Sequence, residues 1–223
     1  MPDLVFDRER RPVVVFDFDG TIADTKPAIC RFVRATAAAF GMPEPTEAQL
    51  AAMIGPPLVD GFQDSFGVSR GRAEEMTATY RAIMAREVTP ADYPPFEGMP
   101  ELLAALRGQG RRLAVASSRA EVSLVPMVEA IGLRESFDAV VGGIDGVRHT
   151  KAASIAAALG ELDARAGQAV MVGDRHHDVE GAHELGVPSI GVYTGTAEPG
   201  ELEGAGADAV AHGVSELARL LGA

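Results

Sequence analysis

Polar side chains that could perform chemistry follow several short apolar runs of this sequence. Asp17 and Asp19 come directly after the apolar run at residues 13–16, and they lead into Gly20 and Thr21. Comparable residues stand after later runs, at residues 113–116 and 169–172, and they are Ser117, Ser118, Asp174 and Asp178. Ligands of open parallel sheets bind at the carboxyl ends of the strands, so these residues are the first candidates for a site.

The carboxylates of Asp17, Asp19 and Asp174 would repel one another in a shared crevice unless a cation lay among them. Oxygen ligands without histidine or cysteine favour a hard ion such as Mg²⁺. Mg²⁺ usually keeps several waters and lets a substrate phosphate complete its coordination, so we expect a ligand that carries phosphate. Ser117 and free backbone N–H groups at the strand ends could supply further donors to that phosphate.

Lys151 stands at the start of a predicted helix, after the run at residues 139–141. A cation in the first turn opposes the helix dipole by roughly 0.3 to 1 kcal/mol. Of the 20 basic residues 18 are arginines, so a lysine at this unfavourable place indicates a requirement for a compact ammonium group. Such a group could pair with a nucleophilic carboxylate and a phosphate oxygen together.

The elements that must position these residues alternate along the chain. Short valine-rich runs alternate with longer helical segments, which predicts an α/β fold with a parallel sheet covered on both faces. The stretch between the first two runs is too long for one crossover helix, and we expect an inserted α-helical domain at residues 22–93. The core domain would then comprise residues 1–21 and 94–223. The predicted strands are residues 13–16, 113–116, 139–141, 169–172, 189–192 and 209–211.

Turn and cap signals divide the insert further. Residues 46–49 (TEAQ) predict a capping box that opens a helix. Residues 54–58 (IGPPL) predict a break, and residues 69–87 predict a long helix. The proline-rich segment at residues 89–100 predicts the linker back to the core.

Composition limits the partners and compartments that we expect. The formal net charge of −12 disfavours a polymeric nucleic acid as partner. Cys30 is the single cysteine, so no disulfide can form within the chain. The apolar runs are far shorter than the ~20 residues that cross a bilayer, and residues 1–11 lack the apolar centre of a signal peptide. We therefore expect a soluble, cytoplasmic protein without a membrane partner. We expect a monomer, because the sequence shows no second apolar helix face and no exposed heptad pattern.

The segments DFDGT, VASS and GDRHHD, together with Lys151 before a helix, resemble the four motifs of the haloacid dehalogenase superfamily, in order and over essentially the whole chain. The resemblance implies a Rossmann-like, doubly wound core with an α-helical cap. It is closest to the branch of phosphoglycolate phosphatase and bacterial 5'-nucleotidase-like phosphatases. It implies a Mg²⁺-dependent phosphatase for a small phosphorylated metabolite, such as phosphoglycolate, a nucleoside 5'-monophosphate or a sugar phosphate.

The resemblance also implies a role for each motif residue. Asp17 would attack phosphorus to form an aspartyl-phosphate, and Asp19 would protonate the leaving oxygen and later deprotonate the hydrolytic water. The Asp17 carboxylate, the Asp19 backbone carbonyl and Asp174 would hold Mg²⁺, while Asp178 would orient Lys151 or a water on the metal. The expected phosphate-binding residues are Gly20, Thr21, Ser117, Ser118 and Lys151.

Several of these residues also have simpler interpretations. Ser118 and Glu121 (SRAE) predict a capping box, and Asp178 could cap the N-terminus of the helix that follows it. His176 and His177 are expected to face solvent from a loop rather than to share a zinc ion. A calcium loop of the EF-hand type fails, because the positions of its turn glycine and bidentate glutamate do not match.

Substrate and reaction class stay open at this stage. Gly55 and Pro56 in the insert, and Arg119 after the serine motif, are the candidates for contacts to the leaving group. A phosphomutase would use the same motifs but protect its aspartyl-phosphate from water. A non-hydrolytic phospho-acceptor would keep the phosphoryl group without turnover. Asp19 argues against a dehalogenase, because dehalogenases of this superfamily have a nucleophile comparable to Asp17 but lack the second acid that Asp19 would provide.

Overall fold

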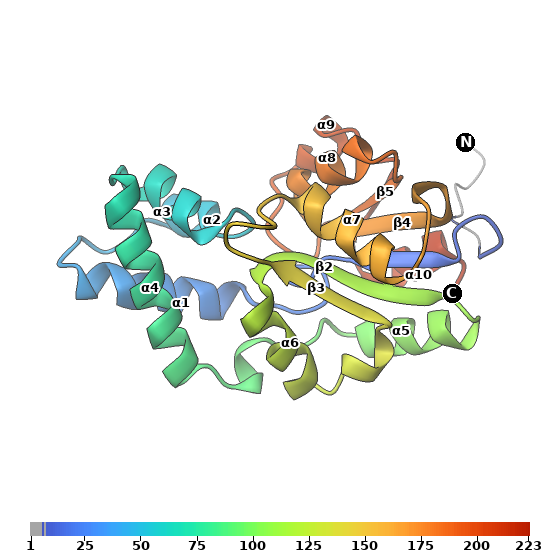
Figure 1. Cartoon of the computed structure of the whole chain (residues 1–223), viewed down its shortest axis with the longest axis horizontal. Coiled ribbons are helices and arrows are strands. Elements are labelled where there is room, and N and C mark those ends of the chain that lie inside the picture. The colour runs from blue at the N-terminus through green and yellow to red at the C-terminus, as the bar shows by residue number, and fades with distance from the viewer. Residues whose placement is uncertain (1–5, 7) are drawn as a thin grey trace. The chain divides into compact units, whose positions relative to one another are not determined.

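The computed structural model describes residue 6 and residues 8–223, and in this part of the chain six parallel strands form one sheet with the order β3-β2-β1-β4-β5-β6 (Figure 1). All six predicted runs are strands, so the predicted α/β fold class is confirmed. Residues 1–5 and 7, which include most of the N-terminal segment considered above, lie outside the described residues. The strands are β1 (Val13–Phe16), β2 (Arg112–Ala120), β3 (Ala139–Gly143), β4 (Ala169–Gly173), β5 (Ser189–Val192) and β6 (Ala209–Ala211).

Helices cover both faces of this sheet. Helices α7 and α8 lie on one side, and α5 and α6 lie on the other (Figure 1). On the first side Val13 and Val15 of β1 share an apolar core with Ile155 of α7 and Ala182 of α8. Successive strand residues point to opposite faces of a sheet, so Phe16 lies on the other face from Val13 and Val15. All four residues of β1 are buried, which means that both faces of this strand are covered. The helices are α5 (Met99–Gly108), α6 (Glu121–Ala130), α7 (Lys151–Glu161), α8 (His176–Glu184), α9 (Glu201–Gly204) and α10 (Val214–Leu221), with short 3₁₀ turns at Arg134–Ser136 and Ala166–Gln168.

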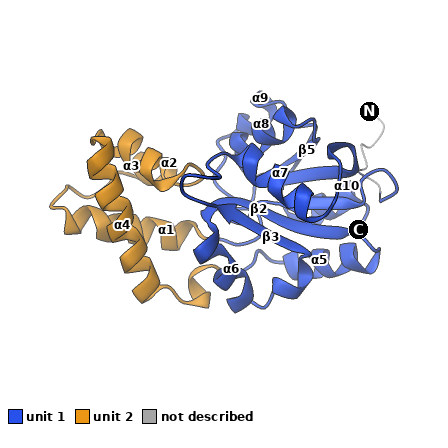
Figure 2. Ribbon diagram, in the orientation of Figure 1, with its two compact units in different colours: residues 1–24, 95–223 blue, residues 25–94 orange. Residues whose placement is uncertain are grey.

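The chain divides into two compact units (Figure 2). Unit 1 contains the sheet and comprises the described residues up to Asp24 together with residues 95–223. Unit 2 comprises residues 25–94 and contains α1 (Lys26–Ala39), α2 (Glu47–Ala52), α3 (Leu58–Phe66), α4 (Arg70–Glu87) and a 3₁₀ turn at Pro90–Asp92. The expected insert at residues 22–93 differs from unit 2 by three residues at its start and one at its end.

Unit 2 has an aromatic core of its own. Tyr80 of α4 meets Phe32 of α1 and Phe62 of α3 edge to face, with ring centroids 6.0 and 6.3 Å apart. The capping box at the start of α2 is present, because Gln49 N–H donates to Thr46 Oγ1 and the Gln49 side chain accepts from the Thr46 backbone. The proline segment at residues 54–58 separates α2 from α3, as the sequence predicts.

The two passages of the chain between the units lie side by side within unit 1. Ala23 and Pro95 form an isolated antiparallel bridge, and Phe96 N–H donates to the Ile22 carbonyl at 3.0 Å. The chain therefore leaves unit 1 shortly after β1 and re-enters it beside the same place, ahead of α5.

Candidate active site

The register of the sheet brings three strand ends to one level. Phe16, the last residue of β1, lies opposite Val115 of β2 and Val172 of β4. Asp17 continues this register, since its N–H donates to the Val172 carbonyl at 2.8 Å. The residues that follow β1 and β4, and the later part of β2, therefore surround one point at the carboxyl edge of the sheet.

Lys151 links two carboxylates at this point. Its Nζ lies 2.8 Å from Asp17 Oδ1 and 2.7 Å from Asp178 Oδ1, and it donates to the Ala116 carbonyl at 3.3 Å. The side chain is only 6% exposed. Lys151 is the first residue of α7, and the sequence predicts this place. Thr150 caps the helix by accepting the Ala153 N–H at 3.1 Å.

Asp174 adds a third carboxylate, and it fits a cation ligand. Asp17, Asp174 and Asp178 are all buried, and each places an oxygen within 4.8 Å of the others. Asp174 Oδ2 accepts the Thr196 N–H at 2.9 Å, while Asp174 Oδ1 is buried and has no hydrogen-bond partner among the described residues. A buried carboxylate oxygen without a partner is costly, and a metal ion would supply the missing contact.

The charges of this cluster do not balance. Three carboxylates and one ammonium leave a formal excess of two negative charges, which a divalent cation would cancel. Burial, opposed by Lys151 and reinforced by the other acids, raises the pKa of Asp17 to about 7. Burial and the nearby carboxylates of Asp178 and Asp17 raise the pKa of Asp174 well above its usual range. Burial alone would lower the pKa of Lys151, but its two acidic partners raise it above its usual value.

Asp178 lies in the first turn of α8 rather than at its cap. The helix begins at His176, three residues before the predicted start at Val179, so Arg175 and not Asp178 is the N-cap residue. Its Oδ2 accepts the Arg175 N–H at 3.0 Å, and its Oδ1 pairs with Lys151. Both oxygens thus have partners within the protein, which fits the expected role of holding Lys151 in place. A Cβ at Gly173 would lie 2.2 Å from the Asp178 carboxyl carbon, so the position of the Asp178 side chain requires a glycine at residue 173.

The expected phosphate-binding residues differ in their contacts. Ser117 is buried, and its Oγ accepts the Arg119 N–H at 3.2 Å. Thr21 is also buried, and Gly20 has φ +79° with its Cα close to Asp174, where a Cβ would lie 2.4 Å from Oδ2. Gly20 therefore serves both the turn and the close approach of the carboxylate.

Ser118 does not form the predicted capping box. β2 runs on to Ala120, and α6 begins at Glu121 without a side-chain cap. The Glu121 carboxylate instead accepts the Gly142 N–H at 3.1 Å and pairs with Arg148 at 2.9 Å. Pairing between β2 and β3 keeps the chain in the strand up to Ala120, so Ser118 is too far from the start of α6 to cap it.

Asp19 and Arg119 form an ion pair that the sequence does not predict. Arg119 Nη2 lies 2.6 Å from Asp19 Oδ1, and Arg119 Nε lies 3.0 Å from Asp19 Oδ2. The fork is almost buried, with the two side chains 10% and 14% exposed. Gly55 and Pro56 belong to unit 2, and their expected role in specificity stays a prediction.

The loop after β5 completes the surroundings of Asp174, and sequence reasoning missed it. Thr194 Oγ1 donates to the Gly20 carbonyl at 2.7 Å, and Thr196 N–H donates to Asp174. A Cβ at Gly195 would lie only 1.9 Å from Asp174 Oδ2. The signal was available, because β5 neighbours β4 and its end must lie at the same edge of the sheet.

His176 and His177 start α8 rather than occupy a loop, and neither is fully exposed. Together with Glu180 they could hold a metal ion. Their rings, however, lie against each other with centroids 3.8 Å apart and planes tilted by 46°, and His176 Nδ1 lies 2.8 Å from Glu201 Oε1. This arrangement favours a structural contact over a shared ion.

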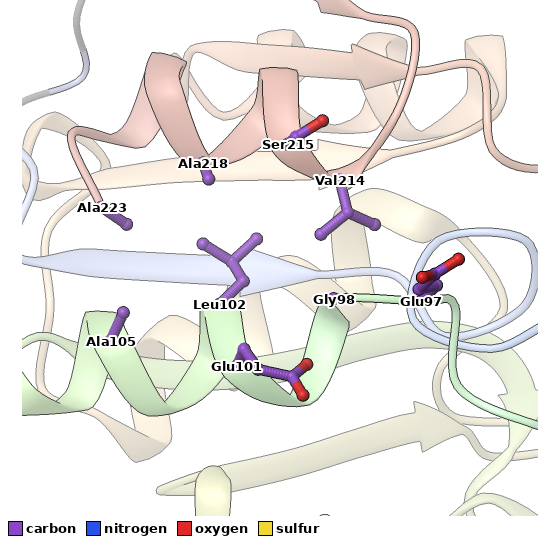
Figure 3. A pocket seen from close by; sticks show the side chains of 9 residues that line it. All are labelled: Glu97, Gly98, Glu101, Leu102, Ala105, Val214, Ser215, Ala218 and Ala223. Atoms are coloured by element: carbon purple, nitrogen blue, oxygen red, sulfur yellow. The ribbon is translucent and has the colours of Figure 1, made fainter.

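A separate pocket of about 520 Å³ lies between α5 and α10 (Figure 3). Leu102, Ala105, Val214 and Ala218 form its apolar part, and the carboxylates of nearby glutamates lie at its edge. No residue of the carboxylate cluster lines it.

The comparisons with known proteins agree with this geometry. The family described as haloacid dehalogenase-like hydrolase matches residues 14–192. The chain belongs to this family. The match covers the sheet from β1 to β5 and the insert, and it ends before β6.

Its relatives within the family include enzymes with different names. A 5'-nucleotidase from Pseudomonas aeruginosa is 37% identical over 194 residues, which cover 86% of this chain and 87% of the relative. The tyrosine-protein kinase PtkA from Mycobacterium tuberculosis is 33% identical over 96% of this chain and 74% of its own length. A crystal structure of a predicted phosphatase from Clostridium acetobutylicum superposes with a TM-score of 0.88 at 31% identity, covering 94% of this chain and 97% of the other.

The family membership and the fold confirm the resemblance to the haloacid dehalogenase superfamily. None of the helices in the described part of the chain has the length and apolar character needed to cross a membrane.

Proposed function

We propose that this phosphatase of the haloacid dehalogenase-like hydrolases uses Mg²⁺ and an aspartyl-phosphate on Asp17 to hydrolyse a small phosphomonoester. The observation that carries the proposal is the buried cluster of Asp17, Asp174 and Asp178 around Lys151. Its negative excess and the unpartnered Asp174 Oδ1 fit a hard divalent cation. No other feature of the described residues combines a nucleophile, a cation-ligand set and an ammonium group.

The first half of the reaction would transfer the phosphoryl group to the protein. An Asp17 carboxylate oxygen forms a bond to phosphorus while the bond between phosphorus and the leaving oxygen breaks. Asp19 gives its proton to that leaving oxygen, which departs as an alcohol. Lys151, held by Asp178, neutralises part of the charge on the transferring group.

The second half would release phosphate. The Asp19 carboxylate, now without its proton, takes a proton from water as the water oxygen attacks phosphorus. The bond between phosphorus and the Asp17 oxygen breaks, so both carboxyl groups return to their starting states. Ser117 and the backbone N–H groups at the strand ends would donate hydrogen bonds to the phosphoryl oxygens in both halves.

The metal would be held by Asp17, Asp174 and the backbone carbonyl of Asp19. When bound, Mg²⁺ would stabilise the negative charge on the phosphoryl oxygens and orient the group for in-line attack. The protein's own contribution is to keep Asp174 in place, through the Thr196 N–H and the close packing of Gly20 and Gly195.

The substrate class is a small phosphorylated metabolite. The 37% identity to a 5'-nucleotidase supports a nucleoside 5'-monophosphate as one candidate, beside phosphoglycolate and sugar phosphates. We expect unit 2 to act as a cap whose segment around Gly55 and Pro56 contributes to specificity. The net charge of −12 continues to disfavour a nucleic-acid polymer.

The first test is release of phosphate from p-nitrophenyl phosphate, with and without Mg²⁺ and with excess EDTA. Activity should require Mg²⁺ and fall below detection in Asp17→Asn, because the amide cannot serve as the nucleophile. Asp163→Asn is the matched control, since it makes the same chemical change at a turn residue outside the site. A panel of phosphomonoesters ranked by kcat/KM would then identify the substrate class.

Three results would contradict the proposal. Metal-loaded protein that hydrolyses no phosphomonoester would exclude a phosphatase. Stable labelling of Asp17 without release of phosphate would instead indicate a phospho-acceptor, and transfer of the group within a sugar phosphate would indicate a mutase.

A further inference from the structure

The ion pair between Asp19 and Arg119 joins two motifs that are 100 residues apart in the sequence. Asp19 follows β1, and Arg119 lies near the end of β2. Each carboxylate oxygen meets a different guanidinium nitrogen, at 2.6 and 3.0 Å. Such a planar fork fixes the orientation of a carboxylate as well as its position, which a single charged contact does not do.

The backbone at Arg119 is itself held firmly. Its N–H donates to Ser117 Oγ, and β2 resumes its pairing with β3 at Ala120 and Gly143 after a register shift. A Cβ at Gly142 would lie 2.6 Å from the Arg119 carbonyl oxygen, so the two strands are in close contact here. The guanidinium therefore extends from a strand end, and a strand end is a more rigid support than a loop.

We propose that Arg119 is a positioning residue for Asp19, and that it sets how well Asp19 serves the leaving oxygen. The inference rests on the proposed function, because it matters only if Asp19 transfers protons in a phosphatase reaction. Proton transfer requires an approach of about 2.6 to 3.2 Å between heavy atoms. The leaving oxygen can replace one of the two hydrogen bonds from Arg119 to Asp19, while the other hydrogen bond keeps the carboxylate in its orientation.

This assignment differs from a contact between Arg119 and the leaving group itself. A guanidinium that bound the leaving group would act mainly on substrates whose leaving group carries a carboxylate or another anionic group of its own. A guanidinium that orients Asp19 would act mainly on esters whose leaving oxygen needs a proton. The two roles therefore differ in the substrates that a mutation slows.

The experiment compares two phosphate monoesters. The leaving group of p-nitrophenyl phosphate departs readily without a proton, whereas that of an alkyl phosphate with an uncharged alkyl group does not. General acid–base catalysis typically contributes about 10²- to 10⁴-fold, so Asp19→Asn should slow the alkyl ester by about that factor more than the aryl ester. Arg119→Ala should show the same selectivity, with kcat for the alkyl ester falling at least about 10-fold more than kcat for the aryl ester. KM for both esters should change little.

Three companion variants make the result specific. Arg119→Lys keeps the charge without the fork and should fall between wild type and Arg119→Ala. The double variant with Asp19→Asn should be little slower than Asp19→Asn alone, because both changes remove the same contribution. Arg148→Ala removes another largely buried ion pair of unit 1, to Glu121, and should not change the ratio of the two esters.

The outcomes separate this inference from the proposed function. Equal slowing of both esters by Arg119→Ala or Arg119→Lys would show a merely structural role and overturn the inference. A rise in KM confined to anionic leaving groups, as in phosphoglycolate, would also overturn it and assign Arg119 to the substrate. Wild-type protein without Asp17-dependent hydrolysis would refute the proposed function first, and the inference would fall with it.

Discussion

Gly195→Ala offers a sharp test of how the loop after β5 controls the carboxylate cluster. The new Cβ would lie 1.9 Å from Asp174 Oδ2, 2.4 Å from its carboxyl carbon and 2.8 Å from the Gly20 carbonyl oxygen. Ordinary contact begins at 3.4 Å, so the carboxylate oxygen would have to move by about 1.5 Å. The loop cannot simply retreat without losing the Thr196 N–H contact to the same oxygen.

A displacement of this size should affect chemistry more than folding. Misplacement by about 1 Å can cost 10²-fold in rate, and Mg²⁺ tolerates little deviation from its octahedral geometry. We expect kcat/KM for p-nitrophenyl phosphate to fall about 100-fold or more, which corresponds to about 2.7 kcal/mol. The free energy of unfolding should fall by only about 1 to 3 kcal/mol, as for other overpacked sites.

The assay is a titration of activity with Mg²⁺, combined with urea denaturation of the same protein. Gly204→Ala is the matched control, because a Cβ there meets nothing within 4 Å, and it should behave as wild type. A Gly195→Ala variant with wild-type kcat/KM and the same Mg²⁺ dependence would refute the idea that this glycine is needed to place Asp174.

Two further predictions concern stability. Lys151→Met should lower the free energy of unfolding by about 3 to 5 kcal/mol in EDTA at pH 7, because it leaves Asp17 and Asp178 buried without their cation. Arg107→Met, the control at an exposed ion pair, should cost at most about 1 kcal/mol. Equal losses for the two variants in urea denaturation would contradict this prediction. Despite its burial, hydrogen bonds from arginine and histidine neighbours lower the pKa of Glu201 from 4.5 to about 2, so its contribution is present above pH 4.5 and is lost as the pH falls toward 2. Glu201→Gln should therefore destabilise the protein at pH 7 by about 1 to 3 kcal/mol and progressively less below pH 4.5, and a difference that stays constant down to pH 2 in the same denaturation series would argue against the ion pair.

The strands were predictable because each is an apolar run between polar segments. β1 is buried on both faces, and such strands have no polar residue to interrupt the run. β2 was predicted too short, since its last four residues are polar or small and stay in the strand only through their approach to β3. The same long-range pairing explains why the capping box at Ser118 and Glu121 is not formed.

The site was predictable in part. The rule that ligands bind at strand ends, together with the motifs, identifies Asp17, Asp174 and Lys151, and the structure brings all three together. The partner of Asp19 was not predictable, because it depends on the direction of a long side chain 100 residues away. The strand-end rule points to the loop after β5 in general, but its place beside Asp174 follows from the order of the strands, which no single sequence pattern gives.

The bridge between Ala23 and Pro95 has a consequence for how freely this architecture can be remodelled. Within unit 1 this bridge holds the two chain passages together, so we expect β1 and β2 to keep their register when another chain joins residues 24 and 95. Loop-closure entropy makes the graft's length a minor matter, since each doubling costs only about 0.6 kcal/mol. A chimera that replaces residues 25–94 with a short flexible linker, or with the helical insert of a relative, would remove or exchange unit 2, for which we propose a role in specificity, and should leave the chemistry of the strand ends intact.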